Sequence, residues 1–370
     1  MKTRSILMTT LCWLMLSMGF TACIDDDGEE PELPVEPETY PAYILNEGLW
    51  NAKNANITRF LPNYKVENLS DFYQEINGKK MGDVANAMME EDENIYVVLN
   101  GSKYVARLDL LCMELARYTF PEAEGAPRCI DVEDGYAYVT QYGGQVTKLN
   151  IKDMTLAGTF KGGDNLEGIV EKDGKLYVAN SYAVDGSDNW IYNKEVFVID
   201  AKTMALEKNI NVVENPTKLF EIDDKIYLIS AGNYLDVPGV LQVIDPKTGT
   251  SKAILNDVNK ITEGNNGLIY GVKSITDWST TPASYVHTFF TYNPSTGTVN
   301  ESSFLQDSPS SFSTNDIYLL EVDEKSGFIY VATSDYTTNG TIYQFDKGGK
   351  LIKSFDSGGI NPSAMVFIND

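Results

Sequence analysis

The side chains that most often carry out chemistry are few in this sequence, and they form no known catalytic pattern. A single histidine, His287, nearly excludes zinc or copper sites built on histidine. No G-x-S-x-G or H-E-x-x-H motif occurs, and the many carboxylates lack a spacing that would name a general acid and a general base. Residues 185–189 offer oxygen ligands for calcium, but they lack the glycine and the closing glutamate of an EF-hand loop. We therefore expect a protein that is not an enzyme and has no catalytic cofactor, with a structural calcium ion left open.

The number and positions of the cysteines limit the possible redox and metal-binding chemistry. Cys12 lies in an N-terminal apolar segment and Cys23 directly follows that segment, so Cys112 and Cys129 are left for the folded part of the chain. A disulfide between them and two separate buried thiols are both open. No C-x-x-C sequence is present, which argues against a redox or zinc motif.

Aromatic residues gather in polar segments that have the composition of loops. Three of the four tryptophans, Trp50, Trp190 and Trp278, stand in such segments among asparagine, serine and glycine. An exposed indole is costly unless something covers it, and aromatic side chains on a rigid scaffold suit the binding of a bulky, partly apolar ligand. The alternative is that long loops fold back and bury their own aromatic side chains.

An internal repeat predicts the elements that position these loops. The phrase turn, apolar residue, tyrosine, apolar residue occurs in residues 42–46, 94–98, 136–139, 175–178, 225–228, 268–271 and 328–331. A short apolar strand precedes nearly every copy and two further strands follow, which gives four strands per unit at a spacing of roughly 46 residues. No helical periodicity of useful length follows Cys23. The repeat predicts an all-β fold, a seven-bladed β-propeller with four-stranded blades.

The two ends of the repeat predict how the ring closes. The first copy lacks a preceding strand, whereas a spare apolar strand, residues 363–368, follows the last blade. We expect this C-terminal strand to join blade one, because closure removes two free sheet edges. We expect the seven repeated tyrosines to pack between blades.

In such a propeller, the loops between second and third strands share one face with the connections between blades. Arg128 begins an inner strand beside the channel, and Asp83, Glu167, Lys218 and Asp316 hold comparable positions. We predict a ligand-binding site on this face, formed by Trp50, Asn51, Tyr104, Arg128, Tyr142, Tyr182, Trp190, Tyr234, Trp278 and Tyr336.

The N-terminus has the features of an export signal. Lys2 and Arg4 precede an apolar run that ends at Thr21-Ala22-Cys23. We predict a lipoprotein signal peptide in residues 1–22, lipidation of Cys23, an acidic, proline-rich tether in 23–41 and the propeller in 42–370. A plain secretory signal is the alternative, because Phe20 replaces the leucine usual in a lipobox.

The charge balance excludes some partners. The chain has a net charge of -24, which argues against nucleic acid and against adsorption to anionic lipid, so we expect membrane contact through the lipid anchor only.

The whole mature chain resembles the YncE-like and surface-layer seven-bladed β-propeller lipoproteins of Bacteroidetes, whose surface-export signal the acidic run 24–30 also resembles. Within that group, ILNEGLW (44–50), NANI (54–57), GDVANAM (82–88), LEGI (166–169) and LYVANSY (176–182) look like parts of the cell-surface cobalamin-binding (BtuG-type) lipoproteins.

The resemblance implies a surface-exposed lipoprotein of the cell outer membrane. Such a protein would bind cobalamin (vitamin B12), as a ligand and not as a catalytic cofactor, on its loop face and pass it to a TonB-dependent outer-membrane transporter. The resemblance assigns no contact residues. A glycan- or peptide-binding propeller of a nutrient-uptake system is the alternative, and a propeller hydrolase or lyase is a third reading.

Overall fold

The computed structural model describes residues 40–62, 68–281 and 283–368. The predicted signal peptide, the tether up to residue 39 and Cys23 lie outside the described residues. Thr39–Asp370 form one compact unit. Within the described part of the chain, no helix is long and apolar enough to cross a membrane.

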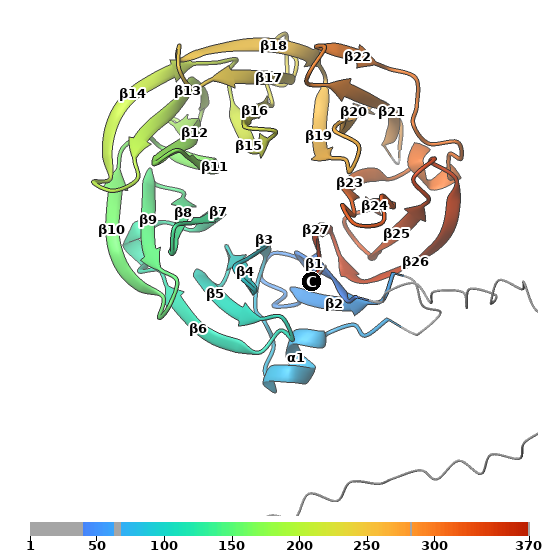
Figure 1. Ribbon diagram of the computed structural model, residues 1–370, viewed down its shortest axis with the longest axis horizontal. Helices are drawn as coiled ribbons and strands as arrows, with labels where there is room; N and C mark the ends of the chain where they lie inside the picture. The colour runs from blue at the N-terminus through green and yellow to red at the C-terminus, as the bar shows by residue number, and fades with distance from the viewer. Residues whose placement is uncertain (1–39, 63–67, 282, 369–370) are drawn as a thin grey trace, which may run out of the picture. The chain divides into compact units, whose positions relative to one another are not determined.

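Seven antiparallel sheets stand around a central channel, which confirms the predicted seven-bladed propeller (Figure 1). Blade 1 contains, from the channel outward, β27 (Pro362–Phe367), β1 (Ala42–Asn46) and β2 (Asn56–Phe60). Blade 2 contains β3 (Ala85–Glu91), β4 (Asn94–Leu99), β5 (Tyr104–Asp109) and β6 (Glu114–Thr119). Blade 3 contains β7 (Pro127–Glu133), β8 (Tyr136–Gln141), β9 (Gln145–Asn150) and β10 (Thr155–Lys161).

The remaining blades repeat this order. Blade 4 contains β11 (Asn165–Lys172), β12 (Lys175–Val184), β13 (Trp190–Asp200) and β14 (Ala205–Asn211). Blade 5 contains β15 (Pro216–Ile222), β16 (Lys225–Ser230), β17 (Val240–Asp245) and β18 (Thr250–Asn256). Blade 6 contains β19 (Val258–Glu263), β20 (Ile269–Asp277), β21 (Ser284–Asn293) and β22 (Thr298–Asn300). Blade 7 contains β23 (Asp316–Val322), β24 (Ile329–Ser334), β25 (Asn339–Phe345) and β26 (Leu351–Ile360).

The C-terminal strand closes the ring, as predicted. β27 pairs antiparallel with β1, and Ala42 stands opposite Phe367 while Leu45 stands opposite Ala364. Among the described residues this closing sheet has three strands, and an isolated bridge between Arg59 and Leu69 occupies the outer edge of β2 where a fourth would lie. The other six blades have the four strands that the repeat predicts.

The repeated tyrosines form the cores between blades. Each sits on the second strand of its blade, where both sheet faces are covered by neighbouring blades, so alternate side chains are buried on either side. All seven are 8% exposed or less: Tyr43, Tyr96, Tyr138, Tyr177, Tyr227, Tyr270 and Tyr330. The prediction that they are structural is confirmed.

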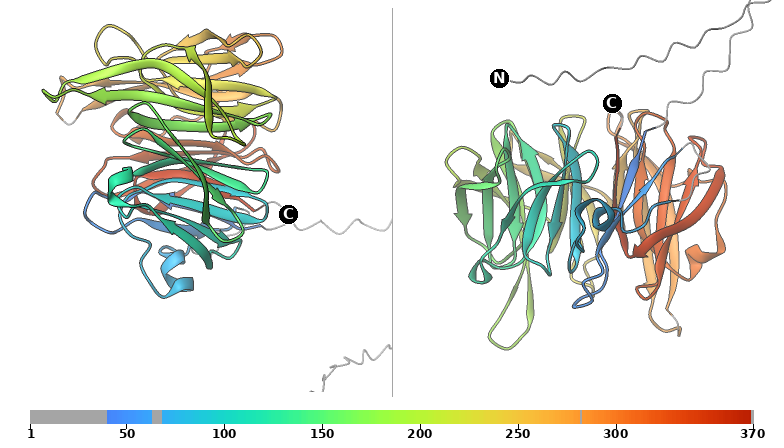
Figure 2. Two further views of the ribbon diagram at one scale, coloured as in Figure 1. Left: turned by 90° about the vertical axis from the view of Figure 1, so that its left-hand side faces the viewer. Right: turned by 90° about the horizontal axis from the view of Figure 1, so that it is seen from below.

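The back-and-forth path of each blade gives the propeller two different faces. Connections between second and third strands, and those between blades, lie on what we call the loop face, whereas the tight turns lie on the opposite turn face. In the right-hand view of Figure 2 the long β12–β13 hairpin and the β1–β2 loop extend away from the end that carries the C-terminus. The chain enters β1 at Ala42, on the turn face, since β1 ends at Asn46 where the β1–β2 loop begins.

A short helix, α1 (Phe72–Asn77), lies in the connection from blade 1 to blade 2. It buries Phe72 and Tyr73 against the core of the first two blades. Six residues are fewer than two helical turns, so this element leaves no readable 3.6-residue period, which is why the sequence did not predict it.

The two remaining cysteines are separate thiols. Cys112 packs in the core cluster of blades 1 and 2, and Cys129 packs against that of blades 3 and 4. Burial raises the pKa of Cys112 to about 12 and that of Cys129 to about 11. Both are therefore protonated and unreactive at neutral pH.

β-Bulges interrupt all seven inner strands near the loop face. In each of them the register with the second strand skips one or two residues: Asn86, Arg128 and Cys129, Glu167 and Gly168, Thr217, Asn259, Tyr318 and Ser363. A bulge re-aims a side chain and increases local twist, and it is common beside functional sites. The bulges therefore set the directions of the side chains around the loop-face end of the channel.

Candidate functional site

The loop face exposes the three tryptophans of the propeller. Trp50 is 65% exposed, Trp190 58% and Trp278 80%. The loops therefore do not fold back over their indoles, which was the alternative left open by the sequence. Exposed apolar side chains gathered on one face of a folded protein mark a surface that something covers.

Five aromatic side chains from blades 3, 4 and 5 form a continuous row that we call the aromatic wall: Tyr142, Tyr182, Trp190, Tyr192 and Tyr234. The rings of Tyr182 and Trp190 are stacked, with centroids 4.7 Å apart and planes 6° from parallel. Tyr142 meets Tyr182 edge to face at 6.1 Å, and Tyr192 meets Tyr234 edge to face at 5.9 Å. These geometries are favourable for aromatic pairs, so the wall is a fixed surface.

An extended hairpin holds the centre of the wall above the sheet. β12 and β13 stay paired out to Val184 and Trp190, beyond Tyr182, where the pairing of β11 with β12 ends. Tyr192 joins the wall because side chains two apart on a strand point to the same side. Sequence reasoning missed Tyr192, although its spacing from Trp190 carried that signal.

The tip of this hairpin is a turn whose backbone donates hydrogen bonds to the carboxylate of Asp185. Asp185 accepts hydrogen bonds from the backbone N–H of Ser187 at 2.7 Å and of Asn189 at 3.0 Å, and from the Asn189 amide. These donors, the Asn189 side chain first, lower the pKa of Asp185. Residues 185–189 therefore form a turn that the Asp185 carboxylate closes. The described residues contain no group of three or more His, Cys, Asp or Glu side chains that could hold a metal ion.

A buried ion pair anchors the wall to the channel. Arg128 Nε lies 3.1 Å from Glu167 Oε2, and the Tyr142 hydroxyl donates to Glu167 Oε1 at 2.8 Å. The Arg128 guanidinium also lies 4.7 Å from the centre of the Tyr142 ring, a cation–π distance. Burial opposes the positive charge, but Glu167 and Tyr142 outweigh it and raise the pKa of Arg128. The predicted residue Arg128 is thus a permanent cation.

A second group of residues faces it across the loop-face end of the channel. Tyr318 donates to Glu47 Oε2 at 2.6 Å and meets Tyr336 edge to face at 5.7 Å. Tyr336 in turn donates to Asp316 Oδ2 at 2.7 Å. We call the charged rim of this opening the channel mouth; it comprises Glu47, Arg128, Glu167, Lys218, Lys260 and Tyr318. Lys260 and Tyr318 were not predicted, because the bulges change which strand residue points inward. Glu47, in the loop that follows β1, was not predicted either.

The loop that carries Trp50 and Asn51 is held by Asp83. The Asp83 carboxylate accepts the backbone N–H of Asn51 at 2.9 Å and that of Lys53 at 3.2 Å. Both of these loop residues have positive φ, 62° and 52°, a conformation that costs energy for residues other than glycine. Asp83 therefore positions the loop rather than facing a ligand.

Two predicted tyrosines also have a strained backbone. Tyr234 and Tyr336 have φ of 59° and 62°. Non-glycine residues in this region are uncommon and cluster at binding sites, where the surrounding structure holds them. Trp278, at the tip of the β20–β21 hairpin, stands on the same face but outside the aromatic wall.

One predicted residue, Tyr104, does not belong to the site. It is 3% exposed, its hydroxyl donates to the Met81 carbonyl at 2.6 Å, and Arg117 covers its ring at 3.9 Å. Tyr104 begins β5 directly after a short loop, so its ring packs into the core of blades 1 and 2. We correct the prediction accordingly.

His287 has local partners. Its Nδ1 lies 2.8 Å from Ser274 Oγ, its Nε2 lies 3.1 Å from the Asn315 carbonyl, and its ring stacks on Tyr285. Burial lowers the pKa of His287, so the ring is neutral at physiological pH. It fastens the β20–β21 hairpin to the connection before blade 7.

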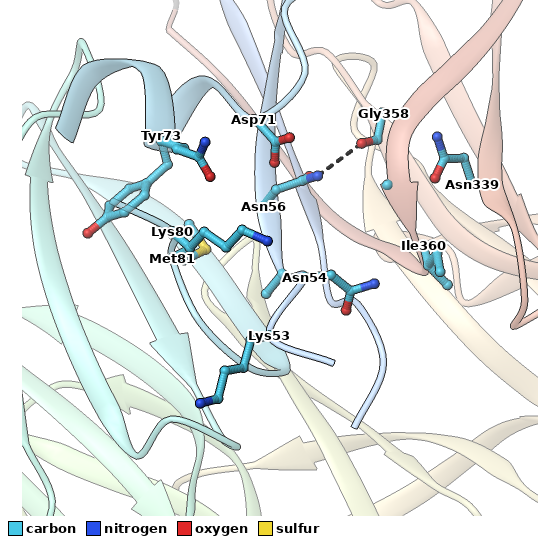
Figure 3. Close-up of a pocket in the computed structure, with 13 residues that line it drawn as sticks. Lys53, Asn54, Asn56, Asp71, Tyr73, Lys80, Met81, Asn339, Gly358 and Ile360 are labelled. Atoms are coloured by element: carbon cyan, nitrogen blue, oxygen red, sulfur yellow. Dashed lines mark hydrogen bonds between the residues drawn. The ribbon is translucent and has the colours of Figure 1, made fainter. Parts of the chain in front are cut away.

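The loop face also has a small polar pocket of about 190 Å³ beside α1 (Figure 3). Its polar lining includes Lys53 and Lys80, the carboxylate of Asp71 and the amide groups of Asn54, Asn56 and Asn339. Asn56 is fixed by a hydrogen bond to the Gly358 carbonyl at 2.9 Å. Sequence reasoning missed this pocket, because its residues come from separate parts of the chain: 53–56, 71–74, 80–81, 339 and 358–360.

The channel itself holds a cavity of about 570 Å³ lined by all seven inner strands. Lys218 lies toward its loop-face end. Toward its turn face the lining is acidic, with Glu91, Glu133, Glu171, Glu221, Glu263 and Glu324.

Comparisons with known proteins define the class by fold alone. No family model matches the sequence, and no curated protein matches it. Hydrazine synthase of Kuenenia stuttgartiensis is similar in structure, with a TM-score of 0.54 and 14% identity over 68% of this chain and 73% of that chain.

Two lyase structures are similar to the same degree. A streptogramin B lyase has a TM-score of 0.53 and 12% identity over 85% of this chain and 87% of its own. Virginiamycin B lyase from Staphylococcus aureus has a TM-score of 0.53 and 11% identity over 73% and 83%. The chain is thus a seven-bladed β-propeller protein.

Proposed function

We propose that this protein is a surface-exposed outer-membrane lipoprotein that binds cobalamin, or a related corrinoid, on its loop face and delivers it to a TonB-dependent transporter. The observation that carries the proposal is the aromatic wall beside the channel mouth, a row of packed rings in which Trp190 and Tyr234 are exposed. A corrin ring is broad and has apolar faces edged with amides, so stacking and hydrogen bonds suit it.

The entry point of the chain supports the presentation of this face. The chain enters β1 at Ala42, on the turn face. A tether that leaves from that side would direct the loop face, with Trp50, Trp190 and Trp278, away from its anchor. A ligand from the medium, and then the transporter, would meet the loop face first.

The chemistry of the site agrees with capture without covalent change. The aromatic wall offers ring faces, and the channel mouth offers both signs of charge. The net charge of -24 does not oppose a corrinoid, which is near-neutral overall. Shape and stacking therefore contribute more than long-range steering.

Titration of the purified chain, residues 24–370, with cyanocobalamin tests the proposal. We expect saturable binding tighter than about 1 µM, equivalent to roughly 8 kcal/mol. Absence of binding at about 10 µM ligand would reject it.

A glycan-binding function is the second candidate, because the polar pocket of Figure 3 favours it. Its amide groups and two lysines suit sugar hydroxyl groups better than a corrin ring. A glycan array separates the two functions. Binding of a glycan that is lost in Asn56→Ala, together with no affinity for cyanocobalamin, would favour the glycan.

A further inference from the structure

Two lysines of the channel mouth form no salt bridge among the described residues. Lys218 on β15 and Lys260 on β19 occupy neighbouring inner strands, near the same end of the channel. Within the part of the chain that the structure describes, neither makes a salt bridge or a side-chain hydrogen bond. Lys260 Nζ instead lies 5.3 Å from the centre of the Tyr318 ring.

The neighbouring charged groups are already committed to other partners. Arg128 pairs with Glu167, Glu47 accepts from Tyr318, and Asp316 accepts from Tyr336. Glu47 interacts electrostatically with Arg128, Lys260 and Lys218, so these groups share one opening. His287 from blade 6 faces the same region; burial lowers its pKa, and the charge of Lys260 contributes to the lowering.

The surroundings of Lys260 disfavour its positive charge. Burial first, and then repulsion by Lys218, lowers the pKa of Lys260 to about 7, and attraction by Asp316 and Glu47 does not restore it. The chain has 53 acidic residues, so the two lysines do not lack salt bridges because carboxylates are scarce. Two lysines without a salt bridge to any described residue, one exposed (Lys218) and one partly buried (Lys260), stand beside an open cavity, and a bound anion would complete this arrangement.

We propose that Lys218 and Lys260 form a binding site for an oxyanion group, a phosphate, phosphodiester or sulfate, at the channel mouth. The anion sits between the two ammonium groups, with Tyr318 and the Arg128–Glu167 pair at its sides. The identity of the bound group rests on the proposed function: if the loop face binds a corrinoid, the group bound here is the phosphodiester of the corrinoid's nucleotide loop.

Binding at this site has a defined dependence on pH. The anion favours the ammonium form of Lys260, so above pH 7 binding must first add a proton to that amine. The affinity therefore falls as pH rises, by roughly tenfold or more between pH 6 and pH 8.5. Burial also raises the pKa of Glu47, so each proton that Glu47 loses as pH rises adds a negative charge that opposes the anion, while Lys218 and Arg128 attract it.

Calorimetric titration with sulfate tests the site, because sulfate keeps its charge over this range. We expect saturable binding at pH 6 with a dissociation constant of order 1 mM, weakened by roughly tenfold or more at pH 8.5. Lys218→Met and Lys260→Met should each weaken it by roughly tenfold or more, while Lys252→Met on the outer strand β18 should not. Thermal melting confirms that each variant folds.

Equal sulfate binding in the wild type and Lys260→Met, or no binding at pH 6, would overturn the proposal. A second arm uses cyanocobalamin and cobinamide, which lacks the nucleotide phosphodiester. If Lys260→Met weakens the binding of cyanocobalamin but not that of cobinamide, the site binds the phosphodiester of the ligand itself. Sulfate binding without corrinoid binding keeps the anion site, with a free oxyanion as its source, and rejects the proposed function. Corrinoid binding without sulfate binding supports the proposed function and rejects the anion site.

Discussion

The indole of Trp190 lies flat against the ring of Tyr182, with centroids 4.7 Å apart and planes 6° from parallel. One indole face is covered by this stack, yet the side chain stays 58% exposed, so the other face is open. A stacked pair with one open face is a prepared platform for a third flat group. The loss of side-chain freedom has occurred before the ligand arrives.

Trp190→Ala should weaken capture of cyanocobalamin by roughly tenfold or more, because it removes the open ring face and frees Tyr182. Calorimetric titration measures the change. Leu111→Ala removes an exposed apolar side chain from a tight turn of blade 2, on the turn face, and should leave the affinity unchanged. Equal affinities for Trp190→Ala and the wild type would exclude the aromatic wall from the site.

Glu167→Ala should destabilise the propeller by about 2 to 4 kcal/mol, because Arg128 would remain as a cation without its carboxylate. The side chains of Arg128 and Glu167 are only 22% and 12% exposed, so solvent replaces little of the lost interaction. Urea unfolding measures the difference. Glu122→Ala breaks a pair with Lys103 whose carboxylate is 88% exposed, and should cost under about 0.5 kcal/mol. Similar costs for both variants would contradict the anchoring role of Glu167.

Glu321→Gln should stabilise the protein at pH 8 but not at pH 4. Glu321 lines the channel cavity and accepts a hydrogen bond from Thr262 at 3.0 Å, which a glutamine oxygen also accepts. Burial, with added repulsion from Glu324, raises the pKa of Glu321 from 4.5 to about 7. The folded state thus holds this proton more tightly than the unfolded chain, so wild-type stability falls as pH rises from about 4.5 to 7.

The gain at pH 8 should be about 1 to 2 kcal/mol, since solvent in the channel screens part of the effect. Denaturant unfolding at both pH values gives the comparison. Glu93→Gln, at an exposed turn on the turn face, serves as the control and should change stability little at either pH. A stability difference for Glu321→Gln that does not vary with pH would show that Glu321 titrates normally.

Met365→Ala should lower the free energy of unfolding by about 2 to 4 kcal/mol. Met365 on β27 is buried in the cluster that joins blades 1 and 7, where it packs with Ile44 and Leu319. The loss opens a cavity where the ring closes. Ile352→Ala on β26 removes a half-exposed side chain and should cost under about 0.5 kcal/mol. A small effect of Met365→Ala would mean that closure contributes little to stability.

The fold could be predicted from the sequence because one short motif, a tyrosine between apolar residues after a turn, repeats seven times. Each copy of the tyrosine phrase is a second strand with both faces covered, so burial imposes the same residue types seven times. α1 was not readable because it is too short to show a period. The joining of the C-terminal strand to blade one was predicted, but the sequence did not predict that the closing sheet has only three strands among the described residues, with a single bridge between Arg59 and Leu69 at its outer edge.

The site was readable only in part. Composition identified Trp50, Trp190 and Trp278, because an indole in a polar segment is conspicuous. Tyr104 was wrongly included because strand position alone does not reveal which tyrosine turns inward. Lys260 and Tyr318 were missed because a bulge near the start of each inner strand shifts the alternation of side chains.

The most direct test of the account uses tryptophan fluorescence. The fourth tryptophan, Trp13, lies in the predicted signal peptide, so the tryptophan fluorescence of residues 24–370 comes from Trp50, Trp190 and Trp278. Cyanocobalamin should be titrated while quenching and equilibrium dialysis are followed in the same samples, with free tryptophan as the absorbance control. The account predicts that quenching and bound ligand rise together to one ligand per chain. Bound ligand without quenching would place the site elsewhere, and no bound ligand would contradict the proposed function.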